Sequence, residues 1–292
     1  MGHHHVEKAL KIGIALTFIF FIVELIGGYV SGSLSLLSDA GHMFRDVFAL
    51  FASLWAISIA KKLPSPTKTF GYHRIEILSA LVSGLLLVCV SAWIAGEAYS
   101  RFFNPTPVEG GIMFVVAVIG LIVNIYVATK LHGSHDLNVK SAFLHVLTDT
   151  FSSVAVIIAA IWIYFTGQTI VDPILSMFIA AVIFVSALFI IKDAFHILLQ
   201  FTPQHLNLDK IIADIEKVKG VEDVHEVHLW SLCSNINVID AHISTKVRKL
   251  AQTEKIKKEI KRKLRKYKIK HTTLEFECEE CINKKKIKEL KH

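Results

Sequence analysis

Two short polar motifs interrupt long apolar stretches of the sequence and supply residue types that bind transition metals. The first motif runs from His42 to Asp46, and the second runs from His145 to Asp149. Residues four apart lie on one face of an α-helix, about 6 Å apart along the axis. Each motif therefore presents one imidazole and one carboxylate side by side. Ionisable groups within apolar, membrane-length helices are costly, which makes these four residues candidates for function.

Together the two motifs supply a ligand set that suits zinc. Two imidazole nitrogens and two carboxylate oxygens match the tetrahedral geometry that zinc prefers, and the two carboxylates neutralise a divalent ion. Imidazole favours zinc, copper, iron or nickel, whereas an all-oxygen site favours magnesium or calcium. We therefore expect His42, Asp46, His145 and Asp149 to bind one metal ion. The alternative is that each pair is a structural hydrogen bond, and the repeated spacing disfavours it.

The same ligands predict a link between metal binding and protons. Metal binding requires carboxylates and imidazoles without their protons, so it releases protons. A site that opens alternately to the two sides of a membrane would therefore exchange metal for protons.

Six apolar stretches are long enough to hold these motifs within a membrane. They run approximately through residues 10–30, 34–60, 75–101, 110–130, 140–166 and 173–191. A helix needs about 20 apolar residues to cross the hydrocarbon core of a bilayer. The sequence therefore predicts an α-helical membrane protein with six transmembrane helices, in which the motifs lie on the second and fifth. Asp172-Pro173 is typical of a helix start, with the aspartate as the cap.

The charge distribution divides the chain into two parts. Residues 1–200 contain 11 Lys+Arg and 11 Asp+Glu, whereas the remainder contains 21 and 14 and carries the whole net charge of +7. We predict a transmembrane domain at 1–201 and a cytoplasmic C-terminal domain at 202–292. The connections near 61–74 and 130–140 carry Lys and Arg, and the opposite connections carry none. The positive-inside rule then places both termini in the cytoplasm, and we expect the plasma membrane as the location.

The C-terminal part has the pattern of a small α+β domain. The spacing of apolar residues predicts a helix around 211–218, strands at 223–232 and 236–245, a second helix around 256–267 and a strand at 271–277. This order predicts a compact sheet with helices on one face. A domain of this size has a modest core and would gain from pairing with a second copy.

Four runs of sequence resemble the cation diffusion facilitators, and they occur in the family order. These runs are LSDAGHMFRD, KTFGYHRIEIL, NVKSAFLHVLTDT and VHEVHLWSLCSNINVIDAHI. The likeness is greatest to the zinc-type branch of cobalt–zinc–cadmium efflux proteins. It implies a secondary active transporter that exports zinc, and also cadmium or cobalt, in exchange for protons. It further implies six helices, a homodimer joined through ferredoxin-like cytoplasmic domains, and a transport site at the four motif residues.

The resemblance also places His225, His242 and Glu277 near the regulatory metal sites of the cytoplasmic domain. Zinc is thus expected as the transported substrate and also as a regulatory ligand. Cys278 and Cys281 have metal-ligand spacing, but such a pair needs further ligands from these groups or from a second subunit.

Other classes of function fit the residues less well. We expect no enzyme, because the His-Glu-x-x-His motif of a metalloprotease is absent and four protein ligands leave no position for a catalytic water. A metal-gated channel or sensor stays open as an alternative, and proton counterflow would distinguish it. The expected partners are the divalent metal ion, protons, the lipid bilayer and a second copy. Nucleic acid is not among them, since no recognised motif accompanies the basic run 246–270.

Overall fold

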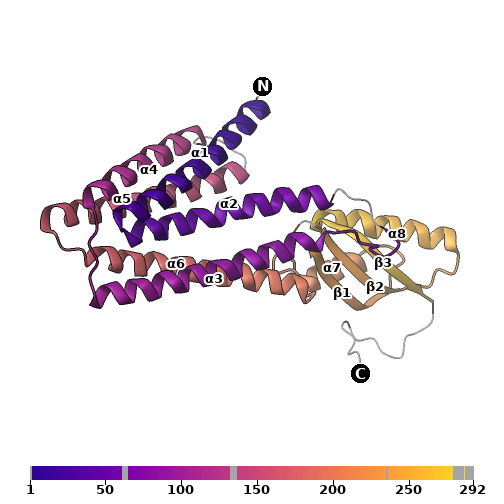
Figure 1. Ribbon diagram of the computed structural model, residues 1–292. Coiled ribbons are helices and arrows are strands. Elements are labelled where there is room, and N and C mark those ends of the chain that lie inside the picture. The colour runs from indigo at the N-terminus through magenta and orange to yellow at the C-terminus, as the bar shows by residue number, and fades with distance from the viewer. Residues whose placement is uncertain (1, 61–64, 132–136, 235, 279–285, 287–292) are drawn as a thin grey trace. The chain divides into compact units, whose positions relative to one another are not determined.

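The computed structural model describes residues 2–60, 65–131, 137–234, 236–278 and 286. Within this part, the side chains at 2–14, 45–46, 49–58, 60, 130–131, 137–145 and 148 are not described. In Figure 1 the long helices precede a small sheet with shorter helices. The long helices are α1 (Gly2–Ser31), α2 (Leu34–Ala60), α3 (Arg74–Phe103), α4 (Gly110–Leu131), α5 (Leu137–Thr166) and α6 (Val171–Leu198).

The chain forms two compact units. The helical unit comprises Met1–Leu54 and Val82–Ile190, and the sheet unit comprises Trp55–Leu81 and Ile191–His292. The predicted boundary between residues 201 and 202 stays a prediction.

Close packing of α1, α2, α4 and α5 forms one part of the helical unit. Leu36 of α2 is fully buried in a cluster with Met113 of α4 and Val156 of α5. Helix α1 approaches α4 closely, because a Cβ atom added at Gly120 would lie 2.2 Å from the ring of Phe20. Small residues at such crossings let two apolar helices pack backbone to backbone. A second cluster joins α3 to α6.

The first turn of α2 is held by a carboxylate from another helix. Asp172, in the first turn of α6, accepts hydrogen bonds from the backbone N–H groups of Leu34 at 2.7 Å and Ser35 at 3.1 Å. The hydroxyl groups of Ser33 and Ser35 also donate to Asp172, at 2.7 and 2.6 Å. The first N–H groups of a helix have no partner within it, and a negative charge there is favourable. This cap fixes the start of the helix that carries His42, whereas the sequence predicted a cap for α6.

Several helices have the length and composition of membrane spans. Among the described residues, the segments that qualify are Arg74–Phe103, Gly110–Thr129, Asp149–Thr166 and Val171–Leu198. Large apolar side chains such as Ile19, Ile122, Ile158 and Phe178 are exposed on the helices, as expected for surfaces that contact lipid rather than water. The helical unit therefore has the character of a multi-pass membrane domain, while the count of six spans stays a prediction.

From Leu208 onward, the described part of the sheet unit contains two packed helices and a three-stranded sheet. Its elements are α7 (Leu208–Glu216), β1 (Asp223–Cys233), β2 (Ile236–Ser244), α8 (Leu250–Leu264), a short 3-10 turn (Arg265–Tyr267) and β3 (Ile269–Glu277). The strand order is β1-β2-β3, with β1 and β2 antiparallel and β2 and β3 parallel. A parallel neighbour needs a crossover connection, and α8 provides it.

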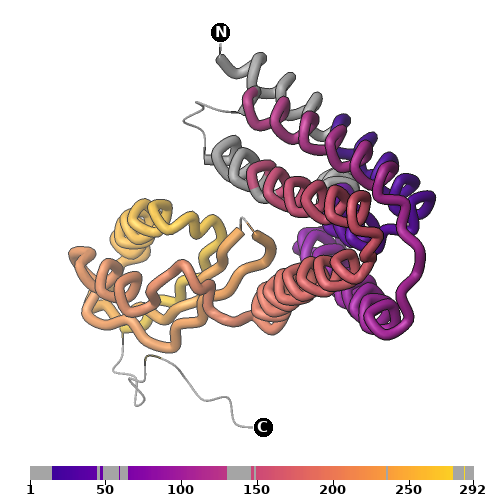
Figure 2. The backbone as a smooth tube through the Cα atoms, turned by 90° about the vertical axis from the view of Figure 1, so that its left-hand side faces the viewer, coloured from indigo at the N-terminus to yellow at the C-terminus, as the bar shows by residue number. Residues whose placement is uncertain are grey.

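One apolar core holds the sheet unit together. Ile215 of α7 and Ile260 of α8 are buried against Ile239 and Ile243 of β2. The two helices contact each other, and Figure 2 shows them beside the strands. The predicted order of helix, strand, strand, helix and strand is therefore confirmed, and both helices pack on the sheet.

Candidate metal sites

The helical unit brings together one residue from each polar motif. His42 lies on α2 and Asp149 lies on α5, and 3.6 Å separates Nε2 of the imidazole from Oδ1 of the carboxylate. Each side chain is 15% exposed, so the pair is neither sealed nor open to solvent. This contact across two helices is what a shared metal ion requires.

The other two predicted ligands lie on the same two helices. Asp46 follows His42 on α2, and His145 precedes Asp149 on α5, each by four residues of continuous helix. Their side chains lie outside the described residues. The complete four-ligand site therefore stays a prediction. The structure describes one imidazole and one carboxylate of that site.

Hydrogen bonds support the α5 side of this pair. Ser153 donates to the backbone carbonyl of Asp149 at 3.0 Å, and Asn124 of α4 donates to the hydroxyl of Ser153 at 3.3 Å. These contacts tie the turn that carries Asp149 to the neighbouring helix. The position of the carboxylate therefore depends on α4 as well as on α5.

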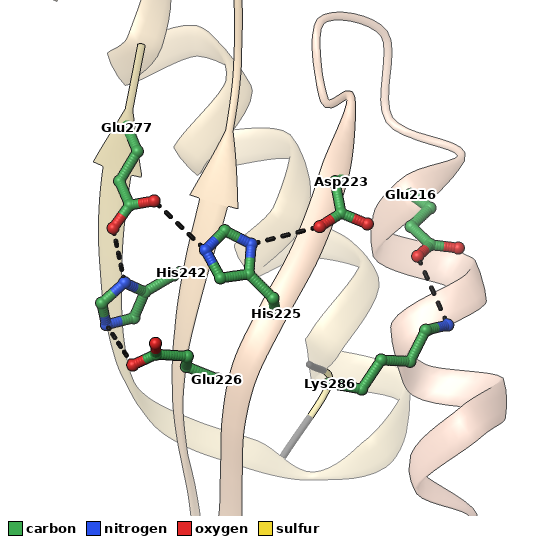
Figure 3. Close-up of polar contacts among 7 residues, drawn as sticks. All are labelled: Glu216, Asp223, His225, Glu226, His242, Glu277 and Lys286. Carbon is green, nitrogen blue, oxygen red and sulfur yellow. Dashed lines mark hydrogen bonds and ion pairs between the residues drawn. The ribbon is translucent and has the colours of Figure 1, made fainter. Parts of the chain in front are cut away.

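The sheet unit holds a second cluster, formed by His225, His242 and Glu277. The carboxylate of Glu277 contacts both rings, with Oε2 at 3.1 Å from Nε2 of His225 and Oε1 at 2.7 Å from Nδ1 of His242. One ligand atom from each residue lies within 4.8 Å of the others. Figure 3 shows the carboxylate above and between the two imidazoles. The structure thus brings together the three tail residues named from the sequence.

Strand register explains why these residues meet. His225 of β1 pairs directly with His242 of β2, and Ser244 of β2 pairs with Glu277 of β3. Successive side chains of a strand point to opposite faces, so His242 and Ser244 share a face. Glu277, paired with Ser244, therefore reaches the histidines from the adjacent strand.

A β-bulge adds a further carboxylate that the sequence did not reveal. Between His225 and His228 the strand β1 contains one residue more than its partner needs, and Glu226 has a φ of 48°. The extra residue of a bulge redirects its side chain. Oε2 of Glu226 consequently lies 3.8 Å from Nε2 of His242, on the side of the ring opposite Glu277 (Figure 3).

Two other acidic residues flank the cluster. Asp223 lies 3.2 Å from Nδ1 of His225, on the ring edge that faces away from Glu277. A carboxylate in this position orients a ligating imidazole and leaves the other nitrogen for metal. Glu275 lies 3.7 Å from Nε2 of His242.

The cysteine pair proposed from the sequence does not join this cluster within the described residues. Cys278 follows Glu277, is exposed, and its Sγ lies 3.4 Å from the carbonyl of Val247. Cys281 lies outside the described residues. Metal binding by the two cysteines stays untested.

The donors of the tail cluster have the chemistry of a zinc site. Two imidazole nitrogens and a carboxylate oxygen form a common ligand set for this ion. Bonds of about 2 Å to a tetrahedral ion separate its ligand atoms by about 3.3 Å, and the three donor atoms lie within 4.8 Å of one another, so small movements of the side chains would bring them to that spacing. Glu226 and Glu275 lie near Nε2, the other nitrogen of the His242 ring, where a carboxylate can orient a ligating imidazole.

Comparisons with known proteins place these two sites in context. Residues 10–199 match the family described as "Cation efflux transmembrane domain", and residues 203–279 match "Cation efflux protein, cytoplasmic domain". A "Cadmium, cobalt and zinc/H(+)-K(+) antiporter" of Bacillus subtilis is 38% identical, over 96% of this chain and 93% of that protein. A "Zinc transporter ZitB" of Yersinia pestis is 38% identical, over 94% and 89%. A "Cation efflux system protein CzcD" of an Alcaligenes strain is 38% identical, over 96% and 91%.

Proposed function

The chain belongs to the cation efflux family, and from this premise we propose that it exports zinc from the cytoplasm in exchange for protons. Cadmium and cobalt are the expected additional substrates. The names of similar proteins, an antiporter of cadmium, cobalt and zinc and a zinc transporter, support this substrate range. The protein acts as a secondary active transporter and not as an enzyme.

The observation that carries this proposal is the approach of His42 to Asp149 between α2 and α5. It occurs in a unit where, among the described residues, four helical segments have the length and composition of membrane spans. An imidazole and a carboxylate from different helices can share one ion, and a relative movement of the two helices can open or close that contact. Asp46 and His145 complete the ligand set in the proposal.

Exchange for protons follows from the chemistry of the donors. The carboxylates and imidazoles bind zinc without their protons. When the ion leaves toward the outside, the empty ligands accept protons from that side. The return of the protonated site to the cytoplasmic side delivers those protons, and the next zinc ion displaces them.

The rest of the architecture follows the same proposal. Six helices span the plasma membrane, both termini lie in the cytoplasm, and the transmembrane domain ends at residue 201. Residues 202–292 form a ferredoxin-like cytoplasmic domain that joins two copies into a homodimer. Zinc bound by His225, His242 and Glu277 regulates transport. The close approach of these three side chains supports this role.

Zinc flux into sealed proteoliposomes tests the function. We expect the wild type to move zinc in response to a proton gradient. Asp149→Ala should reduce this flux to background and leave the dimer intact, as measured by light scattering. Asp193→Ala, which removes an exposed carboxylate from α6, is the matched control and should transport normally.

The proton gradient separates a transporter from a metal-gated channel. Zinc flux that is indifferent to an imposed pH difference would contradict antiport and would favour a channel. Undiminished zinc flux in Asp149→Ala would exclude the proposed transport site.

A further inference from the structure

A second polar layer lies one helical turn away from the His42–Asp149 pair. Asp39 precedes His42 by three residues on α2, and Ser152 follows Asp149 by three residues on α5. The hydroxyl of Ser152 donates to Oδ1 of Asp39 at 2.7 Å. Both pairs join α2 to α5, so they form successive layers along two helices that run in opposite directions.

The third member of this layer is Glu24 of α1. Its side chain is almost completely buried, at 1% exposure. Its carboxyl group is hydrogen-bonded to that of Asp39 and lies within electrostatic range of the carboxylate of Asp149, so it lies near both layers. Its Oε2 has no hydrogen-bond partner in the part of the chain that the structure describes. An unpaired buried oxygen of this kind destabilises the protein unless a ligand satisfies it.

The electrostatic balance of this cluster favours a cation. The polar groups that interact with Glu24 are Asp39 and Asp149. The side chains hydrogen-bonded to Asp39 are Ser152 and Glu24. Among the described residues, no lysine or arginine contributes to either carboxylate. Two buried carboxyl groups can share a hydrogen bond only while one of them holds a proton, and a cation can take the place of that proton. A divalent ion placed between them would satisfy the free oxygen of Glu24 and neutralise the pair.

We propose that Glu24, Asp39 and Ser152 form a second cation-binding site that a divalent metal ion occupies transiently next to the His42–Asp149 pair. The proposal rests on the transport function proposed above and adds a step to it. The donors are two carboxylates and a hydroxyl, without imidazole. Oxygen donors hold zinc less tightly than imidazole does and accept harder ions such as manganese. A weaker neighbouring site lets an ion leave the stronger site in two small steps.

The position of the layer indicates the side on which it acts. Asp39 lies nearer than His42 to the N-terminal end of α2. With the N-terminus of the chain in the cytoplasm, α1 leads outward and α2 begins at the outer side. The oxygen layer therefore lies on the outward path from His42 and Asp149, where an exported ion would pass it.

The competing explanation is a structural contact between α1 and α2. The change Glu24→Gln separates the two, because glutamine keeps the size of the side chain and can donate a hydrogen bond to Asp39. A structural role should therefore survive this change. A metal-binding role should not, because the negative charge and one strong oxygen donor are lost.

Manganese binding to the purified full-length protein, counted by electron paramagnetic resonance, tests the proposal together with zinc flux in proteoliposomes. We expect Glu24→Gln to lose one weakly bound Mn²⁺ per protomer and to transport zinc about 10-fold more slowly, on the scale of a lost metal-site contact. Ser152→Ala should weaken the same Mn²⁺ without abolishing its binding. Glu97→Gln is the matched control, because Glu97 pairs with Arg101 on α3, and it should change neither measurement.

The outcome can be separated from failure of the transport site itself. His42→Ala should abolish zinc flux and keep the weakly bound Mn²⁺. Unchanged Mn²⁺ binding in Glu24→Gln would overturn the proposal, even if zinc flux fell. Loss of transport in His42→Ala with Mn²⁺ lost from Glu24→Gln would support both the transport site and the second site.

Discussion

The two proposed metal-binding regions of this protein use the same kinds of donor but position them in different ways. In the helical unit, His42 and Asp149 come from separate helices and lie 3.6 Å apart. In the sheet unit, Glu277 already contacts both histidines, at 3.1 and 2.7 Å. Ligands on separate helices can part when the helices move. Ligands on strands joined by backbone hydrogen bonds keep their spacing.

This difference matches the two tasks proposed for these sites, transport in the helical unit and regulation in the sheet unit. A transport site must release its ion in every cycle, so tight preorganisation would slow it. A regulatory site must respond to the ion concentration and hold the ion long enough to affect the chain. The orientation of His225 by Asp223 and the second carboxylate beside His242 favour retention in the sheet unit.

The strongest test of this comparison makes the same substitution in each region. We expect His242→Ala to weaken zinc binding by the sheet unit about 100-fold, while zinc flux in proteoliposomes continues at a reduced rate. His42→Ala should abolish flux and leave the sheet-unit zinc in place. Binding is measured by competition with a zinc-sensitive dye on the full-length protein.

A matched control for this pair is His228→Ala. His228 also lies on β1, but it pairs with Asp240 and stands outside the metal cluster. It should retain both zinc binding and flux. If His242→Ala instead abolished transport as completely as His42→Ala, the division between a transport site and a regulatory site would be wrong.

A smaller effect is expected from the carboxylate at the bulge. Glu226→Gln should weaken sheet-unit zinc binding about 10-fold, because an outer carboxylate supports the ligating ring of His242. The positive φ of Glu226 and the hydrogen bond from the N–H of Val227 to the carbonyl of Lys286 at 2.9 Å hold the bulge in place. The same dye competition gives the affinity.

The variant Glu226→Gly separates charge from backbone shape. Glycine accepts a positive φ without strain, so the bulge should persist while the carboxylate is lost. Glu226→Gly and Glu226→Gln should therefore weaken zinc binding equally. Unchanged affinity in both variants would show that Glu226 takes no part in the site.

Local spacing predicts the helical half of this comparison, whereas the three sheet residues were named only from the resemblance to a family. The spacing of His42 and Asp46 needs only the helical period, which is local. The order of helices and strands along the chain was also predictable, although β3 begins at Ile269, earlier than the predicted 271. The part played by Glu226 depends on one extra residue in a strand pairing, and no local pattern marks it.

Asp172 shows a second limit of local reasoning. Its place before Pro173 predicted a helix start, and it does lie in the first turn of α6. Its carboxylate nevertheless caps α2, at a distance of 138 residues from Leu34 in the sequence. A side chain can satisfy any free N–H group that the fold brings near it. Only the packing of α2 against α6 determines which helix receives the cap.

The smallest expected effect concerns the scaffold of the sheet unit and not its metal ligands. Asp214 of α7 accepts hydrogen bonds from Lys266 and Tyr267, which follow α8, and these bonds hold its pKa well below the usual range. A carboxylate with a lowered pKa stabilises the fold at every pH above its unfolded pKa of about 3.9. That contribution is lost as the pH falls through the lower folded pKa. Asp214→Asn should thus be less stable than the wild type from pH 5 to 8, and the difference should shrink in acid.

Urea unfolding followed by the fluorescence of Trp230 measures this difference, with Trp55, Trp93 and Trp162 replaced by phenylalanine in the full-length protein. Trp230 lies on β1, so it reports on the sheet unit. Asp209→Asn, at an exposed position in the first turn of α7, is the control. A gap between wild type and Asp214→Asn that stayed constant down to pH 2 would contradict the assignment. A gap that closes in acid would mean that the scaffold of the sheet unit depends on a charged pair between α7 and the end of α8. The metal cluster should keep its neutral-pH zinc affinity in Asp214→Asn, because its ligands lie on the strands.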